Sequence, residues 1–240
     1  MATPTTRGRT DSRSQPEIPA LEPGDHLQRD EFERRYDAMP DLKKAELIEG
    51  VVYMPSPVRL GRHGGPHADL ITWVGTYRLH TPGVLVGNNS TIRLDMDNAP
   101  QPDALMIVDP NLGGRAQIDA DDYVTGSPEW VGEVSASTAS FDLHTKLRVY
   151  RRNQVLEYVV WRVLDQALDW FVLRQNEYER LSLHASGVYR SEVFPGLWLD
   201  AAALARFDLA SVHQVLQQGL ASPEHQAFVA RLRQALPGTP

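Results

Sequence analysis

Hydrophobic positions along this chain alternate between the spacing of strands and that of helices, with polar turns between them. Strand-like runs occur at 45–54 (a hairpin turning at Glu49–Gly50), 84–86, 90–94, 101–108, 130–135, 157–163 and 168–173. Residues 177–183 and 188–193 indicate further strands or a hairpin. Helical spacing is found over 29–39, 67–80 and 138–152. This order predicts an α/β fold with a mixed central sheet flanked by helices.

The two ends of the chain differ from its middle. Residues 1–27 are rich in Thr, Ser, Pro, Gly and Arg without hydrophobic periodicity, so we expect a disordered tail there. Residues 28–199 form the predicted domain. Residues 200–240 predict a helical extension, with helices at 201–207, 211–220 and 224–236.

Composition narrows the class of protein. The chain has 240 residues, of which 42% are hydrophobic and 23% charged, as in ordinary globular proteins. No apolar run approaches the ~18 residues of a membrane span, and we see no secretory signal. The absence of cysteine excludes disulfides and thiolate metal sites and is consistent with a cytoplasmic protein.

The formal net charge of −7 argues against a dedicated nucleic-acid binder, which is usually basic. A local basic patch can still contact phosphates on an acidic protein. One stretch of the predicted helix 138–152 is basic and comprises His144, Lys146, Arg148, Arg151 and Arg152. From charge alone, a solvated helix face is the preferred interpretation.

Two acidic residues occur in segments that read as buried strand. Asp103 directly precedes the apolar run 104–108, and Glu133 lies within the strand-like segment 130–135. Burying carboxylates is costly unless they are paired or bind a cation. Two such acids with Lys146 nearby are the groups that a Mg²⁺-dependent phosphodiester hydrolase needs, with Mn²⁺ as an alternative. Asp103 and Glu133 are therefore the candidate metal ligands.

The position of Lys146 needs a separate argument. In the PD-(D/E)xK nuclease motif the lysine follows the second acid by two residues, where this chain has Ser135. A helix that doubles back after the strand brings Lys146 to the level of Glu133, at ~1.5 Å per residue. Leu143, Leu147 and Tyr150 predict the face that packs on the sheet, with Lys146 at its edge and partly exposed. The alternative is a surface ion pair with Asp142, worth ~0.3–0.5 kcal/mol.

An ordered series of motifs carries a family resemblance: 46–50 (ELIEG), 55–57 (PSP) with His67 downstream, 101–103 (QPD), 133–138 (EVSAST), Asp142, Lys146 and Tyr150. From about 31 to 199 the chain resembles the Uma2 family (DUF820) of restriction-type endonucleases in the PD-(D/E)xK superfamily. The resemblance implies a restriction-endonuclease-like core, Asp103 and Glu133 as metal ligands, Lys146 as a displaced catalytic lysine and Glu46 as a further acid near the metal. The chain departs from the family pattern at Arg162, where an aspartate is expected, and at Ala136, where a proline is usual.

Other motifs receive a structural interpretation. His63 and His67 have the i, i+4 spacing of a zincin helix, but Gly64, Gly65 and Pro66 predict a break, so we expect a loop or a helix start. On that reading His67 would lie near the mouth of the active site. Glu49 is assigned to the solubility of the hairpin.

Two functional hypotheses remain. The leading one is a metal-dependent endonuclease acting on DNA; the other is a nuclease-fold binding or regulatory protein, which the net charge of −7 and the departures from the family pattern favour. The predicted C-terminal helices either form a homodimer interface or cover the chain's own sheet, and the sequence does not separate the two. Their apolar residues are Val212, Val215, Leu216, Leu220, Phe228, Leu232 and Leu236.

Overall fold

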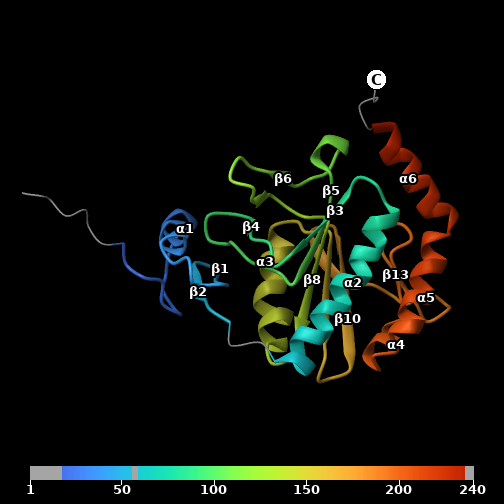
Figure 1. The fold of residues 1–240 in the computed structure, drawn as a ribbon, viewed down its shortest axis with the longest axis horizontal. Helices are drawn as coiled ribbons and strands as arrows, with labels where there is room; N and C mark the ends of the chain where they lie inside the picture. Colours follow the sequence, from blue (N-terminus) through green and yellow to red (C-terminus); the bar gives the residue numbers. More distant parts are fainter. Residues whose placement is uncertain (1–17, 56–58, 236–240) are drawn as a thin grey trace, which may run out of the picture.

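The protein is centred on a mixed six-stranded sheet in the computed structural model, which describes residues 18–55 and 59–235 (Figure 1). The strand order is β11-β10-β9-β8-β5-β3. The bounds are β3 (Val84–Asn88), β5 (Ala104–Val108), β8 (Trp130–Ser135), β9 (Glu157–Arg162), β10 (Ala167–Arg174) and β11 (Glu177–Arg180). Strands β8 and β9 are parallel, and the other neighbours are antiparallel. The predicted α/β class with a mixed sheet is confirmed.

One face of the sheet is covered by the crossover between its two parallel strands. This crossover contains a π-helical segment (Phe141–Lys146) that continues into α3 (Leu147–Arg152). Tyr150 of α3 is buried against Tyr158 of β9, together with Val131 and Ile107. A crossover helix is required here because two parallel strands cannot be joined by a tight turn.

The other face is covered by α2 (Gly65–His80), and outside it lie α5 (Leu209–Leu220) and α6 (Pro223–Ala235) (Figure 1). The short helix α4 (Ala201–Ala205) leads into α5. Trp73 and Tyr77 of α2 share one buried cluster with apolar residues of these helices, namely Val212, Leu216, Leu220, Phe228 and Leu232.

The apolar C-terminal residues that suggested a homodimer therefore lie largely in the chain's own core. Val215 is half-buried, and Leu236 lies outside the described residues. The alternative that these helices cover the chain's own core is the one observed, so their buried apolar residues give no support to a homodimer. Within residues 18–55 and 59–235, no helix is long and apolar enough to cross a membrane.

An N-terminal unit stands beside the main sheet (Figure 1). It contains α1 (Arg29–Asp37) and a hairpin of β1 (Glu46–Ile48) and β2 (Val51–Tyr53). Glu49 and Gly50 at the turn have φ of 51° and 75°, which confirms the predicted turn. Phe32, Leu47 and Val52 form the centre of a separate buried cluster.

The segment 18–27 differs from the expected tail. The Gly24 amide donates to the Val52 carbonyl at 2.9 Å, and the Leu27 amide donates to the Gly50 carbonyl at 2.8 Å. This segment is therefore ordered against β2, because the edge of the hairpin offers unpaired backbone groups. The rest of the predicted tail, residues 1–17, lies outside the described residues.

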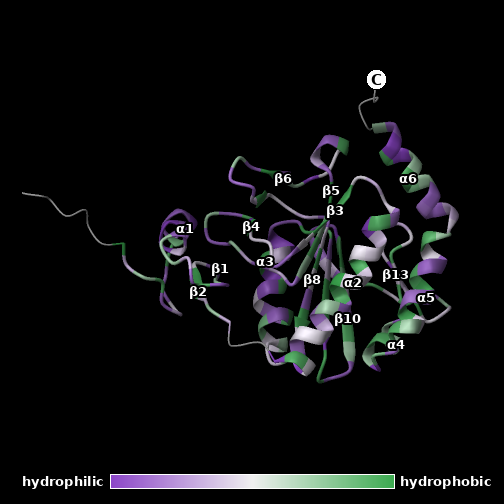
Figure 2. Ribbon diagram, viewed as in Figure 1, coloured by the Kyte–Doolittle hydropathy of each residue, from purple (hydrophilic) through white to green (hydrophobic). Residues whose placement is uncertain are grey.

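The remaining strands are short. They are β4 (Ile92–Arg93), β6 (Gln117–Ile118), β7 (Val124–Thr125), β12 (Tyr189–Arg190) and β13 (Trp198–Leu199). The strands predicted over 90–94, 177–183 and 188–193 are shorter in the structure, because few of these residues pair with a neighbouring strand. Figure 2 shows hydrophobic residues concentrated along the strands of the main sheet, whereas the loop around β6 is hydrophilic.

Candidate functional site

Asp103 and Glu133 lie on adjacent strands at one end of the sheet. Ala104 of β5 pairs with Gly132 of β8 in antiparallel register, so Asp103, one residue earlier, is level with Glu133. Side chains alternate between faces along a strand, which places both acids on the face covered by α3. The Val134 amide donates to Asp103 Oδ2 at 2.7 Å. Both side chains are buried.

Lys146 bridges two carboxylates in the interior. Its Nζ lies 2.9 Å from Glu133 Oε1 and 2.9 Å from Glu46 Oε1. The Tyr150 hydroxyl also donates to Glu133 Oε1, at 3.1 Å. Lys146 has a relative exposure of only 3%, so the expectation of a partly exposed lysine was wrong.

The π-helical segment Phe141–Lys146 explains this difference. The Leu147 amide donates to the Asp142 carbonyl five residues earlier, so the turn is wider than that of an α-helix. The wider turn rotates Asp142 and Lys146 toward the sheet, where both are buried. Leu143, which α-helical spacing placed on the packing face, is only half-buried. The spacing of hydrophobic residues in the sequence does not reveal such a π-helical turn.

Glu46 enters the site from the N-terminal hairpin. It is the first residue of β1, and its Oε1 accepts from the Gln101 amide at 2.7 Å as well as from Lys146. The neighbouring acid of the hairpin turn behaves differently. Glu49 is exposed and forms an ion pair with Arg148 at 3.3 Å, a surface position that agrees with its assigned role in solubility.

Asp142 is buried beside the site without contacting Lys146. Thr138 Oγ1 donates to Asp142 Oδ2 at 2.6 Å, and the Tyr158 hydroxyl donates to the Asp142 carbonyl at 3.1 Å. No ion pair within 4.0 Å joins Asp142 to Lys146, so the alternative of a surface pair between them was wrong. Asp142 instead adds negative charge to the interior.

The charges at this site are unbalanced. Four carboxylates are buried here (Glu46, Asp103, Glu133 and Asp142), and Lys146 is the one buried Lys or Arg within residues 18–55 and 59–235. Burial raises the pKa of Glu133 to about 8, against the opposing effect of the Lys146 ammonium. Burial disfavours the charged lysine, yet the carboxylates of Glu133 and Glu46 raise the pKa of Lys146 well above its usual value. An excess of buried negative charge favours the binding of a cation.

Asp103 also contacts groups that the sequence did not single out as site residues. His63 Nε2 lies 3.3 Å and Lys44 Nζ 3.7 Å from Asp103 Oδ1. Burial alone would raise the pKa of Asp103, but the hydrogen bond from His63 and the charge of Lys44 lower it to about 2. No sequence motif surrounds Lys44, so its contact with Asp103 becomes visible only in the folded structure.

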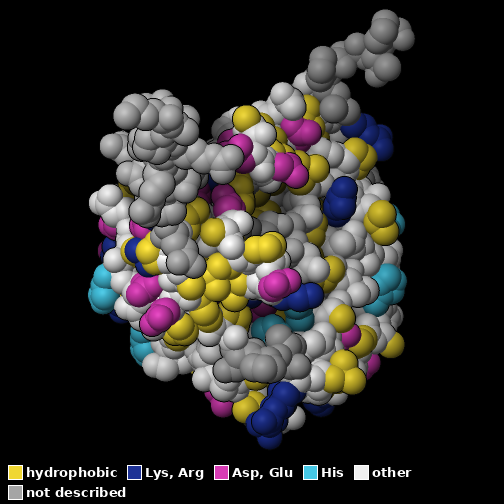
Figure 3. All heavy atoms as spheres, turned by 60° about the vertical axis from the view of Figure 1, so that its left-hand side comes forward, with side chains coloured by type: hydrophobic (Ala, Val, Ile, Leu, Met, Phe, Trp, Pro, Cys, Tyr) yellow, Lys and Arg dark blue, Asp and Glu magenta, His cyan; other side chains and the backbone are white. Residues whose placement is uncertain are grey.

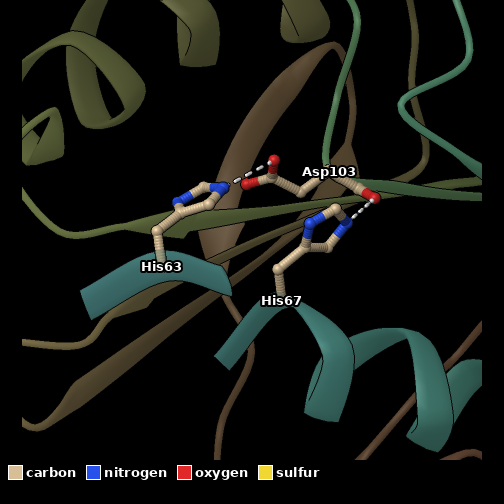
Figure 4. A group of neighbouring side chains, drawn as sticks. All are labelled: His63, His67 and Asp103. Atoms are coloured by element: carbon tan, nitrogen blue, oxygen red, sulfur yellow. Dashed lines mark hydrogen bonds and ion pairs between the residues drawn. The ribbon is translucent and has the colours of Figure 1, made fainter. Parts of the chain in front are cut away.

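The two histidines lie on one continuous helical segment. A π-helical turn (Leu60–Gly64) runs directly into α2, whose second residue is Pro66. The predicted break between the two histidines was therefore wrong, whereas the expected helix start is close to the observed one, because α2 begins at Gly65. His67 Nε2 lies 2.8 Å from the main-chain oxygen of Asp103, and His63 points to its carboxylate (Figure 4).

These three residues can hold a metal ion. Ligand atoms of His63, His67 and Asp103 lie within 4.8 Å of one another, and no other group of three or more His, Asp or Glu residues meets that distance in the part of the chain that the structure describes. The His63 side chain is 25% exposed, so an ion from solution can reach it. Figure 3 shows histidine side chains next to basic and acidic side chains, beside a hydrophobic area.

Comparison with known proteins agrees with this fold. A crystal structure from Anabaena variabilis, described as a "putative nuclease belonging to DUF820", superposes with a TM-score of 0.51 and 13% sequence identity, covering 72% of this chain and 97% of that one. At 13% sequence identity, this superposition shows that the two proteins share a fold and nothing more. No curated protein matches the sequence. The model of the Uma2 family, described as "Putative restriction endonuclease", matches residues 29–202, which is more than half of the chain. The protein is therefore a member of the Uma2 family, and this membership supports a nuclease function with a nucleic acid as substrate.

Proposed function

We propose that this protein is a metal-dependent endonuclease that hydrolyses phosphodiester bonds of DNA. The observation that carries the proposal is the buried group of Glu46, Glu133 and Lys146 beside Asp103, with Lys146 Nζ 2.9 Å from each of two carboxylates. A buried lysine among acids is costly for a protein to maintain and is typical of a functional site.

Asp103 and Glu133 are the proposed ligands of Mg²⁺, with Mn²⁺ as the alternative, because both ions prefer oxygen ligands. The fit rests on four buried carboxyl groups, which stand against a single buried lysine among residues 18–55 and 59–235 and offer oxygen ligands to a cation. A divalent ion bound there supplies Lewis-acid activation of water and neutralises charge on the phosphate.

Lys146 remains protonated because the surrounding carboxylates raise its pKa. Its ammonium is the proposed stabiliser of the negative charge that develops on the phosphate oxygens as water attacks phosphorus and the P–O bond to the leaving oxygen breaks. Glu46 and the Tyr150 hydroxyl hold Lys146 and Glu133 in position. Glu46 is in addition the proposed third acid near the metal.

Cleavage of supercoiled, linear and single-stranded DNA with Mg²⁺, with Mn²⁺ and with a chelator tests the proposal. The parent is expected to cut only with the metal, Asp103→Ala is expected to be inactive, and Glu224→Gln, an exposed acid on α6, should cut like the parent. DNA binding without cleavage by the parent would instead favour the binding or regulatory protein that the net charge of −7 suggests.

The proposal places the enzyme in the cytoplasm, where a protein without cysteine needs no oxidising environment. It assigns no dimer interface to the C-terminal helices, whose buried side chains pack on α2 and on β13. Cutting of both strands by a single site would then require two successive binding events.

A further inference from the structure

We infer that His63 and His67 make the position beside Asp103 a binding site for a divalent transition-metal ion that accepts nitrogen ligands, such as Fe²⁺, Co²⁺, Ni²⁺ or Zn²⁺, in preference to Mg²⁺. The inference names the ion of the proposed nuclease site and rests on that proposal for its biological meaning. Binding of the ion is measured without DNA, so the inferred metal site and the proposed nuclease activity can be disproved separately.

The three residues are close enough to share one ion, because their ligand atoms lie within 4.8 Å of one another. Metal–nitrogen distances of about 2.1 Å place neighbouring ligand atoms of a six-coordinate ion about 3 Å apart. His63 Nε2 is 3.3 Å from Asp103 Oδ1, and His67 Nε2 is 2.8 Å from the Asp103 main-chain oxygen. One aspartate thus offers two oxygens, each next to an imidazole nitrogen (Figure 4).

The helix fixes both imidazoles on one side. The segment from the π-helical turn into α2 is continuous, and residues four apart on a helix lie on the same face. The ring centroids of His63 and His67 are 5.6 Å apart. Asp103 is held in turn by the Val134 amide at 2.7 Å, so the ligands are positioned before any ion binds.

The type of ligand determines which ion is preferred. Mg²⁺ binds oxygen almost exclusively, whereas imidazole suits the later first-row metals. The competing explanation is an ion pair between Asp103 and a protonated His63 that binds no metal. That explanation gives His67 no role beyond a hydrogen bond to the backbone.

Co²⁺ is a suitable probe, because its visible absorption reports nitrogen and oxygen ligands. The full chain, freed of metal with a chelator, is titrated with Co²⁺ and then with Mg²⁺ in about a hundredfold excess. We expect one equivalent of Co²⁺ to bind, to give a d–d absorption band, and to remain bound in the presence of Mg²⁺. In His63→Gln and His67→Gln, each made separately, binding should weaken about tenfold or more.

His80→Gln is the matched control, since His80 is an exposed histidine on the same helix. It should bind Co²⁺ like the parent. Equal affinity in the parent and in both site variants would overturn the inference, as would displacement by Mg²⁺ or an absence of binding to the parent. Mg²⁺-dependent cleavage by a parent protein that binds no Co²⁺ would overturn it while supporting the nuclease. Co²⁺ binding to the parent, lost in the variants but without any cleavage under any metal, would support the site and contradict the nuclease.

Discussion

Lys146 and Glu46 are 100 residues apart in the sequence, yet their side chains meet at 2.9 Å in the interior of the protein. The contact joins the crossover helix to the N-terminal hairpin. Glu133 accepts from the same ammonium, so one buried cation serves two buried acids. The three side chains stabilise the fold only together, because removing one of them leaves a buried charge without its partner.

Lys146→Met should abolish any metal-dependent cleavage and also destabilise the fold by about 3 kcal/mol, because two buried carboxylates lose their cation. Arg148→Met is the control, since Arg148 lies on the same helix but is exposed. Urea unfolding of both variants at pH 7.5 measures the difference. A Lys146→Met protein as stable as the parent would contradict a stabilising role for the contacts of Lys146 with Glu46 and Glu133.

Metal removal should lower the melting temperature of the parent. A ligand that binds only the folded state at about 100 times its Kd adds about 2.7 kcal/mol of stability. Asp103→Asn keeps an oxygen to accept from the Val134 amide but loses the charge, so its melting temperature should respond little to added metal. Asp165→Asn, at an exposed acid outside the site, should respond like the parent. An equal response in all three proteins would exclude Asp103 as a ligand.

Glu157 should make stability depend on pH. This side chain is fully buried at the start of β9, and burial raises its pKa to about 7, although Ser191 and the amides of Glu192 and Val193 donate to it. A carboxyl with a raised folded pKa contributes stability below its unfolded pKa, and this contribution is lost as the pH rises through the folded pKa. The free energy of unfolding of the parent should therefore fall relative to Glu157→Gln between pH 4.5 and pH 7. The change is at most a few kcal/mol. A constant difference between the two proteins across this range would contradict the raised pKa.

Gly132→Ala should destabilise the protein by about 1–3 kcal/mol, because overpacking a filled core forces side chains from their positions. A Cβ at Gly132 would meet the ring of Trp130 and would lie 3.3 Å from Leu70 Cδ2. Gly75→Ala is the matched control: no atom lies within 4 Å of its added Cβ, and the residue is within α2. There alanine should raise stability by about 0.5–1 kcal/mol through helix propensity. The melting temperature should thus fall in Gly132→Ala and rise in Gly75→Ala, as measured by thermal unfolding.

The sequence predicted the parts of the site that lie on strands. Asp103 and Glu133 stand next to or within apolar runs, and an acid in such a run is visible without a structure. The position of Lys146 was predicted on an α-helical period, which the π-helical segment Phe141–Lys146 violates. Lys44 reaches Asp103 only through the fold, because no local pattern relates residues from different elements.

The site histidines show what glycine and proline predicted correctly, a helix that starts near His67, and what they predicted wrongly, a break between His63 and His67. Pro66 is the second residue of α2, yet the preceding π-helical turn (Leu60–Gly64) continues directly into this helix. Gly64 and Gly65 weaken helix propensity, but tertiary contacts of His63 and His67 with Asp103 hold the segment. Propensity alone could not decide between a loop and a helix here.

The long separation between Glu46 and Lys146 also has a consequence for the synthesis of the protein. Glu46 leaves the ribosome 100 residues before the lysine that neutralises it. Until then the hairpin of β1 and β2 would have to bury a carboxylate without its cation, at a cost that a small unit with its own cluster cannot meet. We therefore expect the N-terminal hairpin to be made first but to dock only after β8 and the crossover helix have formed. Fragments that end before Lys146 should remain sensitive to proteases in the hairpin, whereas fragments that extend through β9 and β10 should protect it.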